Sequence, residues 1–135
     1  MGHSITKHVR GFHCDAYGHV NNARYLEFFE EARWQALSDS DLINTFNHLG
    51  LQFFIVNINI DFKKPVMPEA VMEINTSLGA FKRKTMSFIQ TISVDGQVTT
   101  QAEVTFVLFD SAAQSATSLT EEIEQLFKSF KNAKS

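Results

Sequence analysis

Residues 15–37 read Asp-Ala-Tyr-Gly-His-Val-Asn-Asn-Ala-Arg-Tyr-Leu-Glu-Phe-Phe-Glu-Glu-Ala-Arg-Trp-Gln-Ala-Leu. The first eight residues form a polar turn, in which Gly18 supplies the backbone freedom that a tight turn requires. Apolar side chains then recur with the spacing of one helical face, at Tyr25, Leu26, Phe29, Ala32, Ala36 and Leu37. Asn21 or Asn22 is a natural N-cap. The sequence therefore predicts a buried helix that begins near Ala23.

Asp15 lies about one turn upstream of this predicted helix. The unpaired N–H groups at the start of a helix attract full or partial negative charge. A carboxylate beside such a site suggests chemistry on a carbonyl group. An aspartate before a glycine turn is also a common structural Asx turn, so both interpretations of Asp15 stand at this point.

Length and composition indicate a single domain spanning residues 1–135, with 44% hydrophobic residues to build its core. The net charge of −3 gives no electrostatic reason to expect a nucleic-acid partner. No apolar run approaches the roughly 20 residues of a membrane span. One cysteine forms no internal disulfide and the N-terminus lacks a signal-peptide core, so we expect a cytoplasmic protein. Residues 1–4 resemble an expression scar and are left out of the fold prediction.

The remaining sequence predicts strands, a connector and a final helix. A first strand is expected at residues 5–12, and residues 38–49 form a helical connector or lid that begins at Ser38 or Ser40 and ends at Gly50. The clearest strand alternates with one apolar face at Phe54, Val56, Ile58, Ile60 and Phe62.

Further strands follow at residues 70–78, 86–94 and 98–108, with turns near residues 79–84 and at Asp95-Gly96. Ser118 to Glu121 has capping-box spacing and starts a C-terminal helix with Lys128 and Lys131 near its end. Together these elements predict an α+β fold, in which about five antiparallel strands curl around one long central helix.

The pattern Asp15-x-x-Gly18-His19-Val20-Asn21-Asn22-x-x-Tyr25-x-x-x-x-Glu30-x-x-Arg33 resembles the signature of hotdog-fold acyl-CoA thioesterases of the 4-hydroxybenzoyl-CoA thioesterase type. Residues 56–60, and Pro65 after two lysines, are similar to the bacterial long-chain members. The resemblance covers nearly the whole chain. It implies the hotdog fold, and a dimer or tetramer with each active site between two subunits. The implied reaction is hydrolysis of medium- to long-chain fatty acyl-CoA to free acid and coenzyme A, without metal or cofactor.

By the same resemblance Asp15 is the catalytic carboxylate, acting either as a general base on water or as a nucleophile. The backbone N–H of Asn22 or Ala23 would polarise the thioester carbonyl. His19 is expected to support the loop as a hydrogen-bonded structural residue. His13, Asp15 and His19 form a crude metal-like cluster, but they lack an established ligand spacing, and we expect no metal.

Two further groups are candidates for binding acyl-CoA. Basic residues that could meet the phosphates of coenzyme A are Lys63, Lys64, Lys82, Arg83 and Lys84, although turn lysines are usually just solvated. Candidate acyl-pocket residues are Tyr25, Phe28, Phe29, Phe54 and Asn57, together with Trp34, Phe46 and Phe53. Asn57 and Asn59 could equally satisfy backbone groups near an interface.

Two other functions remain open from the sequence. One is an aromatic acyl-CoA thioesterase. The other is a non-catalytic acyl-CoA or lipid-binding hotdog module, in which Asp15 only shapes the turn.

Overall fold

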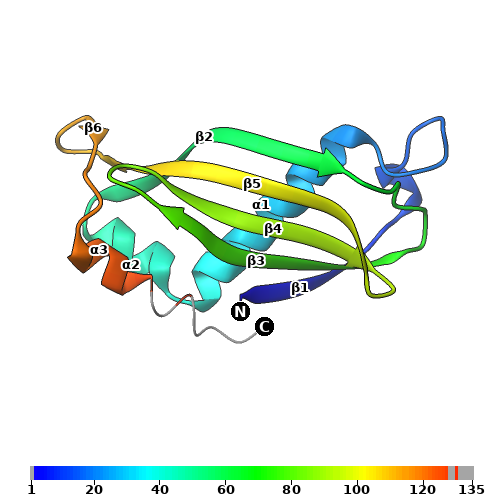
Figure 1. The fold of residues 1–135 in the computed structure, drawn as a ribbon, viewed down its shortest axis with the longest axis horizontal. Coiled ribbons are helices and arrows are strands. Elements are labelled where there is room, and N and C mark those ends of the chain that lie inside the picture. The colour runs from blue at the N-terminus through cyan, green and yellow to red at the C-terminus, as the bar shows by residue number, and fades with distance from the viewer. Residues whose placement is uncertain (1, 128–129, 131–135) are drawn as a thin grey trace.

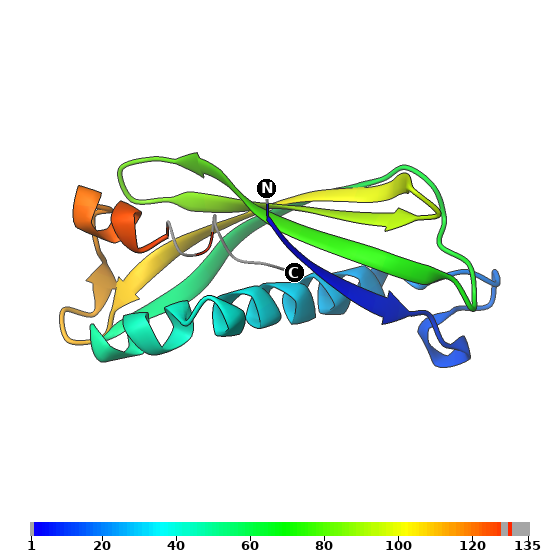
Figure 2. The same ribbon diagram turned by 90° about the horizontal axis from the view of Figure 1, so that it is seen from below.

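The computed structural model describes residues 2–127 and 130, and it consists of one curved antiparallel sheet with a long helix across its inner face (Figures 1 and 2). The strands are β1 (His3–His8), β2 (Leu51–Phe62), β3 (Val71–Phe81), β4 (Met86–Val94), β5 (Gln97–Asp110) and β6 (Ser115–Ala116). The helices are η1 (Gly11–His13), α1 (Asn22–Asp39), α2 (Leu42–His48) and α3 (Glu121–Leu126). The sheet order is β1-β3-β4-β5-β2, with the short β6 paired to β5. The predicted α+β arrangement is confirmed.

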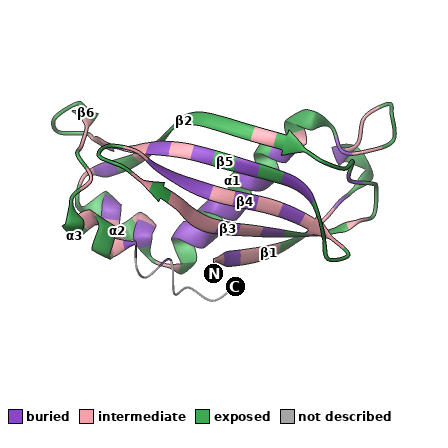
Figure 3. Ribbon diagram, in the orientation of Figure 1, coloured by how far each residue is buried: buried purple, intermediate pink, exposed green. Residues whose placement is uncertain are grey.

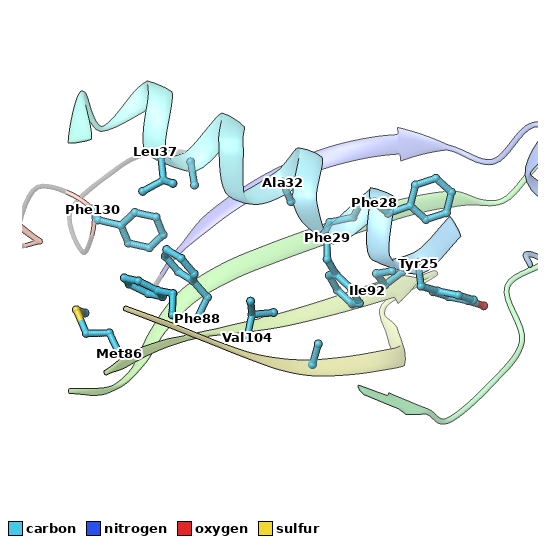
Figure 4. Packing of buried hydrophobic residues seen from close by; sticks show 14 of the residues in the cluster. Tyr25, Phe28, Phe29, Ala32, Leu37, Met86, Phe88, Ile92, Val104 and Phe130 are labelled. Carbon is cyan, nitrogen blue, oxygen red and sulfur yellow. The ribbon is translucent and has the colours of Figure 1, made fainter. Parts of the chain in front are cut away.

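The hydrophobic core lies between α1 and the inner face of the sheet (Figures 3 and 4). On the helix, Phe29, Ala32 and Ala36 are almost completely buried. On the sheet, Phe88 and Phe106 stack with ring centroids 4.8 Å apart. The helix face differs from the prediction at three positions, because Leu26 is 45% exposed whereas Phe28 and Arg33 are buried.

Arg33 is a charged residue in the core and is held by a buried polar network. Its Nη1 donates to Gln90 Oε1 at 3.1 Å, while Gln90 Nε2 donates to the Phe29 carbonyl and to Thr76 Oγ1. Burial lowers the pKa of the Arg33 guanidinium. The network links α1 to β3 and β4, so Arg33 has a structural role in holding the helix on the sheet.

Strand β2 contains a bulge that the sequence prediction missed. Its register with β5 shifts between Ile55 and Asn57, which leaves Val56 as the extra residue. Beyond the bulge, Ile58, Ile60 and Phe62 lie opposite inward-facing β5 residues, as predicted. Before it, Leu51, Phe53 and Ile55 take the inward positions, so the prediction that Phe54 and Val56 face the core is wrong.

The N-terminal residues and the turns also depart from the prediction. His3 and Ser4, which were set aside, belong to β1 and pair with β3, and β1 ends at His8 rather than at residue 12. Gly79 lies within β3 rather than in a turn, and glycine is needed there because a Cβ would collide with Ser87 Oγ on β4. Asp95 and Gly96 both have positive φ, which confirms the predicted hairpin turn.

The helix starts that were predicted after α1 are corrected as well. The N-cap of α2 is Asp41 rather than Ser38 or Ser40, and that of α3 is Thr120 rather than Ser118. Lys128 and Lys131 lie outside the described residues. The segment α2 is no loose lid, because Leu42 and Phe46 are buried and the Phe46 ring packs on Phe53 and Phe127.

Candidate active site

Asp15 lies on a small, well-ordered loop that precedes α1. Cys14 and Val20 form a bridge across its base, and the Asp15 N–H donates to the His19 carbonyl at 3.1 Å. At the tip, the Gly18 N–H donates to the Asp15 carbonyl at 3.0 Å, and Gly18 takes φ +83°. This positive φ is the reason that glycine is needed at position 18. Backbone bonds therefore fix where the Asp15 side chain begins.

The two oxygens of the half-buried Asp15 carboxylate differ in their partners. Oδ1 accepts the Tyr17 N–H at 2.9 Å, which makes an Asx turn. Oδ2 has no hydrogen-bond partner among the residues that the structure describes. The turn thus orients the carboxylate through one oxygen and leaves the other available to water or to a substrate.

The start of α1 has the N-cap predicted from the sequence. Asn21 Oδ1 accepts the Ala23 N–H at 2.9 Å, and the Asn21 N–H in turn donates to the His13 carbonyl. Of the two amides predicted to polarise a carbonyl, that of Ala23 is therefore already used in capping. The Asn22 N–H has no partner within the described part of the chain, so it is the better donor for a bound oxygen atom.

His13 and His19 have different surroundings. His13 is buried, its Nδ1 accepts the Arg10 N–H at 2.9 Å, and its ring meets the Phe28 ring edge-on at 5.0 Å. Burial, with smaller contributions from nearby cations, lowers the pKa of His13, so it is neutral near pH 7. The His19 ring stacks with Tyr17 and makes no side-chain hydrogen bond among described residues. His19 supports the loop through its backbone carbonyl rather than its ring.

The predicted basic residues fall into two groups at opposite ends of the molecule. Lys63 and Lys64 follow β2 at the Asp15 end, where Val66 pairs with Val20 on the loop, and their Nζ atoms donate to Gln101 and Gln97. Residues 82–84 are exposed in the β3–β4 hairpin, which lies beside α3 at the other end (Figure 1). One subunit does not bring both groups to Asp15.

The predicted acyl-pocket residues are also divided. Tyr25, Phe28 and Phe29 are core residues, and the Tyr25 hydroxyl accepts the Val66 N–H at 3.3 Å. Phe54 is 43% exposed and stacks on Phe109, and Asn57 is exposed beside the bulge. A hollow of about 340 Å³ gathers Trp34, Phe53 and Phe54 where α1, α2 and β2 meet, with Ile43, Asn47, Leu51 and Gln52.

The surface between this hollow and the Asp15 end carries exposed apolar side chains that sequence periodicity alone did not identify. Ile55, Ile58 and Phe62 lie opposite buried β5 residues and so face the helix side of the sheet. They are nevertheless 39–51% exposed. We call these three residues the β2 strip. Their exposure reflects the position of β2 at the edge of the sheet, with no further strand beyond it in the described chain.

The described residues contain neither a metal-binding cluster nor a membrane-spanning helix. In that part of the chain, no group of three His, Cys, Asp or Glu side chains is arranged to hold a metal ion. Within the same part, none of the helices combines the length and apolar character that crossing a bilayer demands.

Comparison with known proteins gives consistent matches. Residues 9–127 match the family described as the thioesterase-like superfamily. The long-chain acyl-CoA thioesterase FadM of Escherichia coli K12 is 40% identical over 126 residues, which cover 89% of this chain and 96% of that protein. The crystal structure of YbaW, a probable thioesterase from E. coli, superposes with a TM-score of 0.90 at 37% identity, covering 94% of this chain and 97% of that one.

A more distant structure shares the fold alone. Slr0204, a 1,4-dihydroxy-2-naphthoyl-CoA thioesterase from Synechocystis, is 18% identical with a TM-score of 0.78, over 93% of this chain and 94% of that one. These matches confirm the hotdog fold that the sequence resemblance implied.

Proposed function

The chain belongs to the thioesterase-like superfamily, and from this premise we propose that it hydrolyses medium- to long-chain fatty acyl-CoA to free fatty acid and coenzyme A. The observation that carries the proposal is the 40% identity to FadM over nearly the full length of both chains. The Asp15 loop and the α1 N-terminus agree with it, since they combine an available carboxylate oxygen with an available backbone N–H.

In the proposed reaction, Asp15 Oδ2 is the reacting oxygen while Oδ1 stays in the Asx turn. The carboxylate either takes a proton from the attacking water or attacks the carbonyl carbon itself, in which case water then hydrolyses the mixed anhydride. In both routes the C–S bond breaks and coenzyme A leaves as a thiolate that takes up a proton. The Asn22 N–H, aided by the helix dipole, stabilises the negative charge that develops on the carbonyl oxygen.

We also propose that the protein forms a homo-oligomer, which is at least a dimer and in its full form a tetramer. Strand β2 is a long edge strand with exposed apolar residues, and unpaired edges of this kind are usually covered. A two-fold axis through the middle of β2 would join two sheets edge to edge with both helices on the same side. Such an axis reverses the ends of the second subunit, so its residues 82–84 would approach the Asp15 end of the first.

A non-catalytic acyl-CoA-binding module is the second candidate. The observation that favours it is the Asx-turn bond from Tyr17 to Asp15, because a purely structural aspartate makes the same bond. For either candidate we propose a cytoplasmic location, supported by the free thiol of Cys14, which suits a reducing compartment.

Release of free coenzyme A thiol from acyl-CoA substrates of graded length, with benzoyl-CoA in parallel, tests the proposed function. We expect kcat/KM to rise from short to long acyl chains and to exceed that for benzoyl-CoA, because each buried methylene contributes about 0.8 kcal/mol. Equal or faster turnover of benzoyl-CoA would favour the aromatic thioesterase. Binding of acyl-CoA without thiol release would favour the binding module.

A further inference from the structure

The hollow between α1, α2 and β2 is lined by five apolar residues together with Asn47 and Gln52, and it lies far from Asp15 along the helix. Trp34, Phe53 and Phe54 give it aromatic sides, and Asn47 of α2 stands at its rim. Its volume of about 340 Å³ is at the lower end of small-ligand sites. Trp34 is 52% exposed and its Nε1 donates to Glu30, so this ring is held over open space rather than packed in the core.

The β2 strip connects the active-site end to this hollow. At the active-site end, Phe62 of β2 meets the Tyr25 ring of α1 with centroids 5.1 Å apart. At the other end, Trp34 of α1 shares the hollow with Phe53 of β2. The helix and the strand therefore run in opposite directions between these two contacts. Ile55 and Ile58 lie between the two contacts, exposed on the helix side of the sheet.

The length of this path can be bracketed from the helix and the strand. The two contacts are nine residues apart on each element, which corresponds to about 14 Å at 1.5 Å per residue along α1 and to about 30 Å at 3.3 Å per residue along β2. An extended alkyl chain advances roughly 1.3 Å per carbon when its bonds are about 1.5 Å long. At this spacing the path holds roughly 11 carbons along α1 and roughly 23 along β2, so an eight-carbon chain ends before the hollow by either measure.

We propose that this hollow receives the methyl end of the acyl chain and so measures chain length, with Trp34 as the residue that stops it. The inference rests on the proposed acyl-CoA hydrolysis and adds where the chain ends. Long chains reach the hollow, whereas an eight-carbon chain ends on the β2 strip. Each methylene that reaches an apolar site strengthens binding about fourfold, so filling the hollow separates long from short chains.

Asn47→Trp tests the proposal, because Asn47 is an exposed rim residue whose replacement by a large ring fills the hollow without disturbing the core. The measured quantity is the ratio of kcat/KM for palmitoyl-CoA to that for octanoyl-CoA. We expect the ratio to fall at least tenfold. The matched control is His48→Trp, the same substitution at the next position of α2, which faces other hollows and should leave the ratio unchanged.

A second variant works in the opposite direction. Trp34→Ala removes the proposed stop, and we expect the ratio of kcat/KM for an eighteen-carbon chain to that for a fourteen-carbon chain to rise severalfold. If Asn47→Trp lowers activity on all chain lengths equally, or if both tryptophan variants behave alike, the chain ends elsewhere and the inference is wrong. If the unmodified protein hydrolyses no acyl-CoA at all, it is the proposed function that fails.

Discussion

The geometry of Asp15 is compatible with both the structural and the catalytic interpretation of this residue. The Asx turn uses Oδ1 alone, and Oδ2 has no partner among the described residues. A turn that pins one oxygen restricts the rotation of the carboxylate, which favours a fixed direction of attack. The structural bond is thus compatible with catalysis, and only a chemical test separates the two roles.

Asp15→Asn is that test. Asparagine keeps an oxygen for the Tyr17 N–H, so the loop should fold as before, but it has neither basicity nor nucleophilicity. Because a positioned general base contributes about 10² to 10⁴ in rate, we expect kcat to fall at least about a hundredfold while acyl-CoA binding persists. Thiol release and equilibrium binding measure the two effects.

Asp95→Asn is the matched control, since Asp95 is also a turn aspartate before a glycine and its substitution keeps a favourable hairpin dipeptide. It should retain full activity. An Asp15→Asn enzyme with more than about a tenth of the original kcat would return Asp15 to a structural role.

His13 predicts a pH dependence of stability. Its pKa is lowered in the folded state by burial, with Lys7, Arg24 and Arg10 acting in the same direction and Glu27 against them. As pH falls through the ordinary value of about 6.5, the unfolded chain binds the proton first, so the free energy of unfolding decreases below that pH. We expect His13→Gln to flatten the decline of Tm between pH 7 and pH 5. His48→Gln, an exposed control, should keep the original slope, and an unchanged slope in His13→Gln would contradict the prediction.

At the residue scale, local chemistry was predictable from the sequence, whereas the burial of the polar residues His13 and Arg33 was not. The cap at Asn21 and the turn at Gly18 follow from side-chain length and backbone freedom, which are properties of those residues alone. The burial of His13 and Arg33 depends on partners far away in sequence, such as Gln90, 57 positions beyond Arg33. The only signal in the sequence for the Arg33–Gln90 hydrogen bond was that both are polar residues in otherwise apolar elements. Matching the two residues requires knowledge of how the helix packs on the sheet.

At the scale of elements, alternation located every long strand, but it could not locate the bulge in β2. A bulge inserts one residue and reverses the faces on one side of it, while both halves of the strand still alternate. Residues 54–62 therefore looked like one continuous face. Gly79 is a similar case. Glycine is required at this position because a Cβ would collide with Ser87 on the neighbouring strand, which the local sequence does not reveal.

The two groups of basic residues, 63–64 and 82–84, are expected to contribute differently to coenzyme A binding. Lys82→Ala with Arg83→Ala removes exposed cations that make no ion pair among the described residues. If they meet phosphates, KM for acyl-CoA should rise about tenfold while KM for a truncated acyl-pantetheine stays constant. Steady-state kinetics with both substrates measure the difference.

Lys63→Ala with Lys64→Ala is the comparison at the other end of the subunit. Both ammonium groups already donate to glutamines, so we expect a smaller rise in KM. Parallel changes for acyl-CoA and acyl-pantetheine in the first double variant would show that residues 82–84 do not bind the phosphates.

At the scale of the whole molecule, the single subunit leaves its site open along one side. The β2 strip is exposed, and the two basic groups are at opposite ends (Figure 1). A second subunit joined at β2 would resolve both features at once, because it would cover the strip and bring its own residues 82–84 toward Asp15. Sequence patterns predict an edge strand poorly, since edge and central strands alternate alike; the strand order decides it.

Val56 allows this assembly to be tested at its proposed centre. It is the bulged residue near the middle of β2, it is 55% exposed, and it pairs with no β5 residue, so its side chain contributes little to the fold of one subunit. A two-fold axis through the middle of β2 places Val56 near its own copy. Val56→Asp would therefore set two negative charges against each other, which costs several kcal/mol and should weaken self-association about a hundredfold.

Light scattering at micromolar concentration should give the unmodified protein at least twice the mass of one chain, and Val56→Asp the mass of one chain. Val98→Asp is the matched control, because Val98 is 41% exposed and pairs with Ser93 of β4, outside the stretch of β5 that pairs with β2, and it should stay associated. If the site lies between subunits, thiol release must fall with association in Val56→Asp and recover at high protein concentration. A monomeric unmodified protein, or a fully active Val56→Asp monomer, would mean that one subunit suffices for hydrolysis and that the β2 strip serves the acyl chain alone.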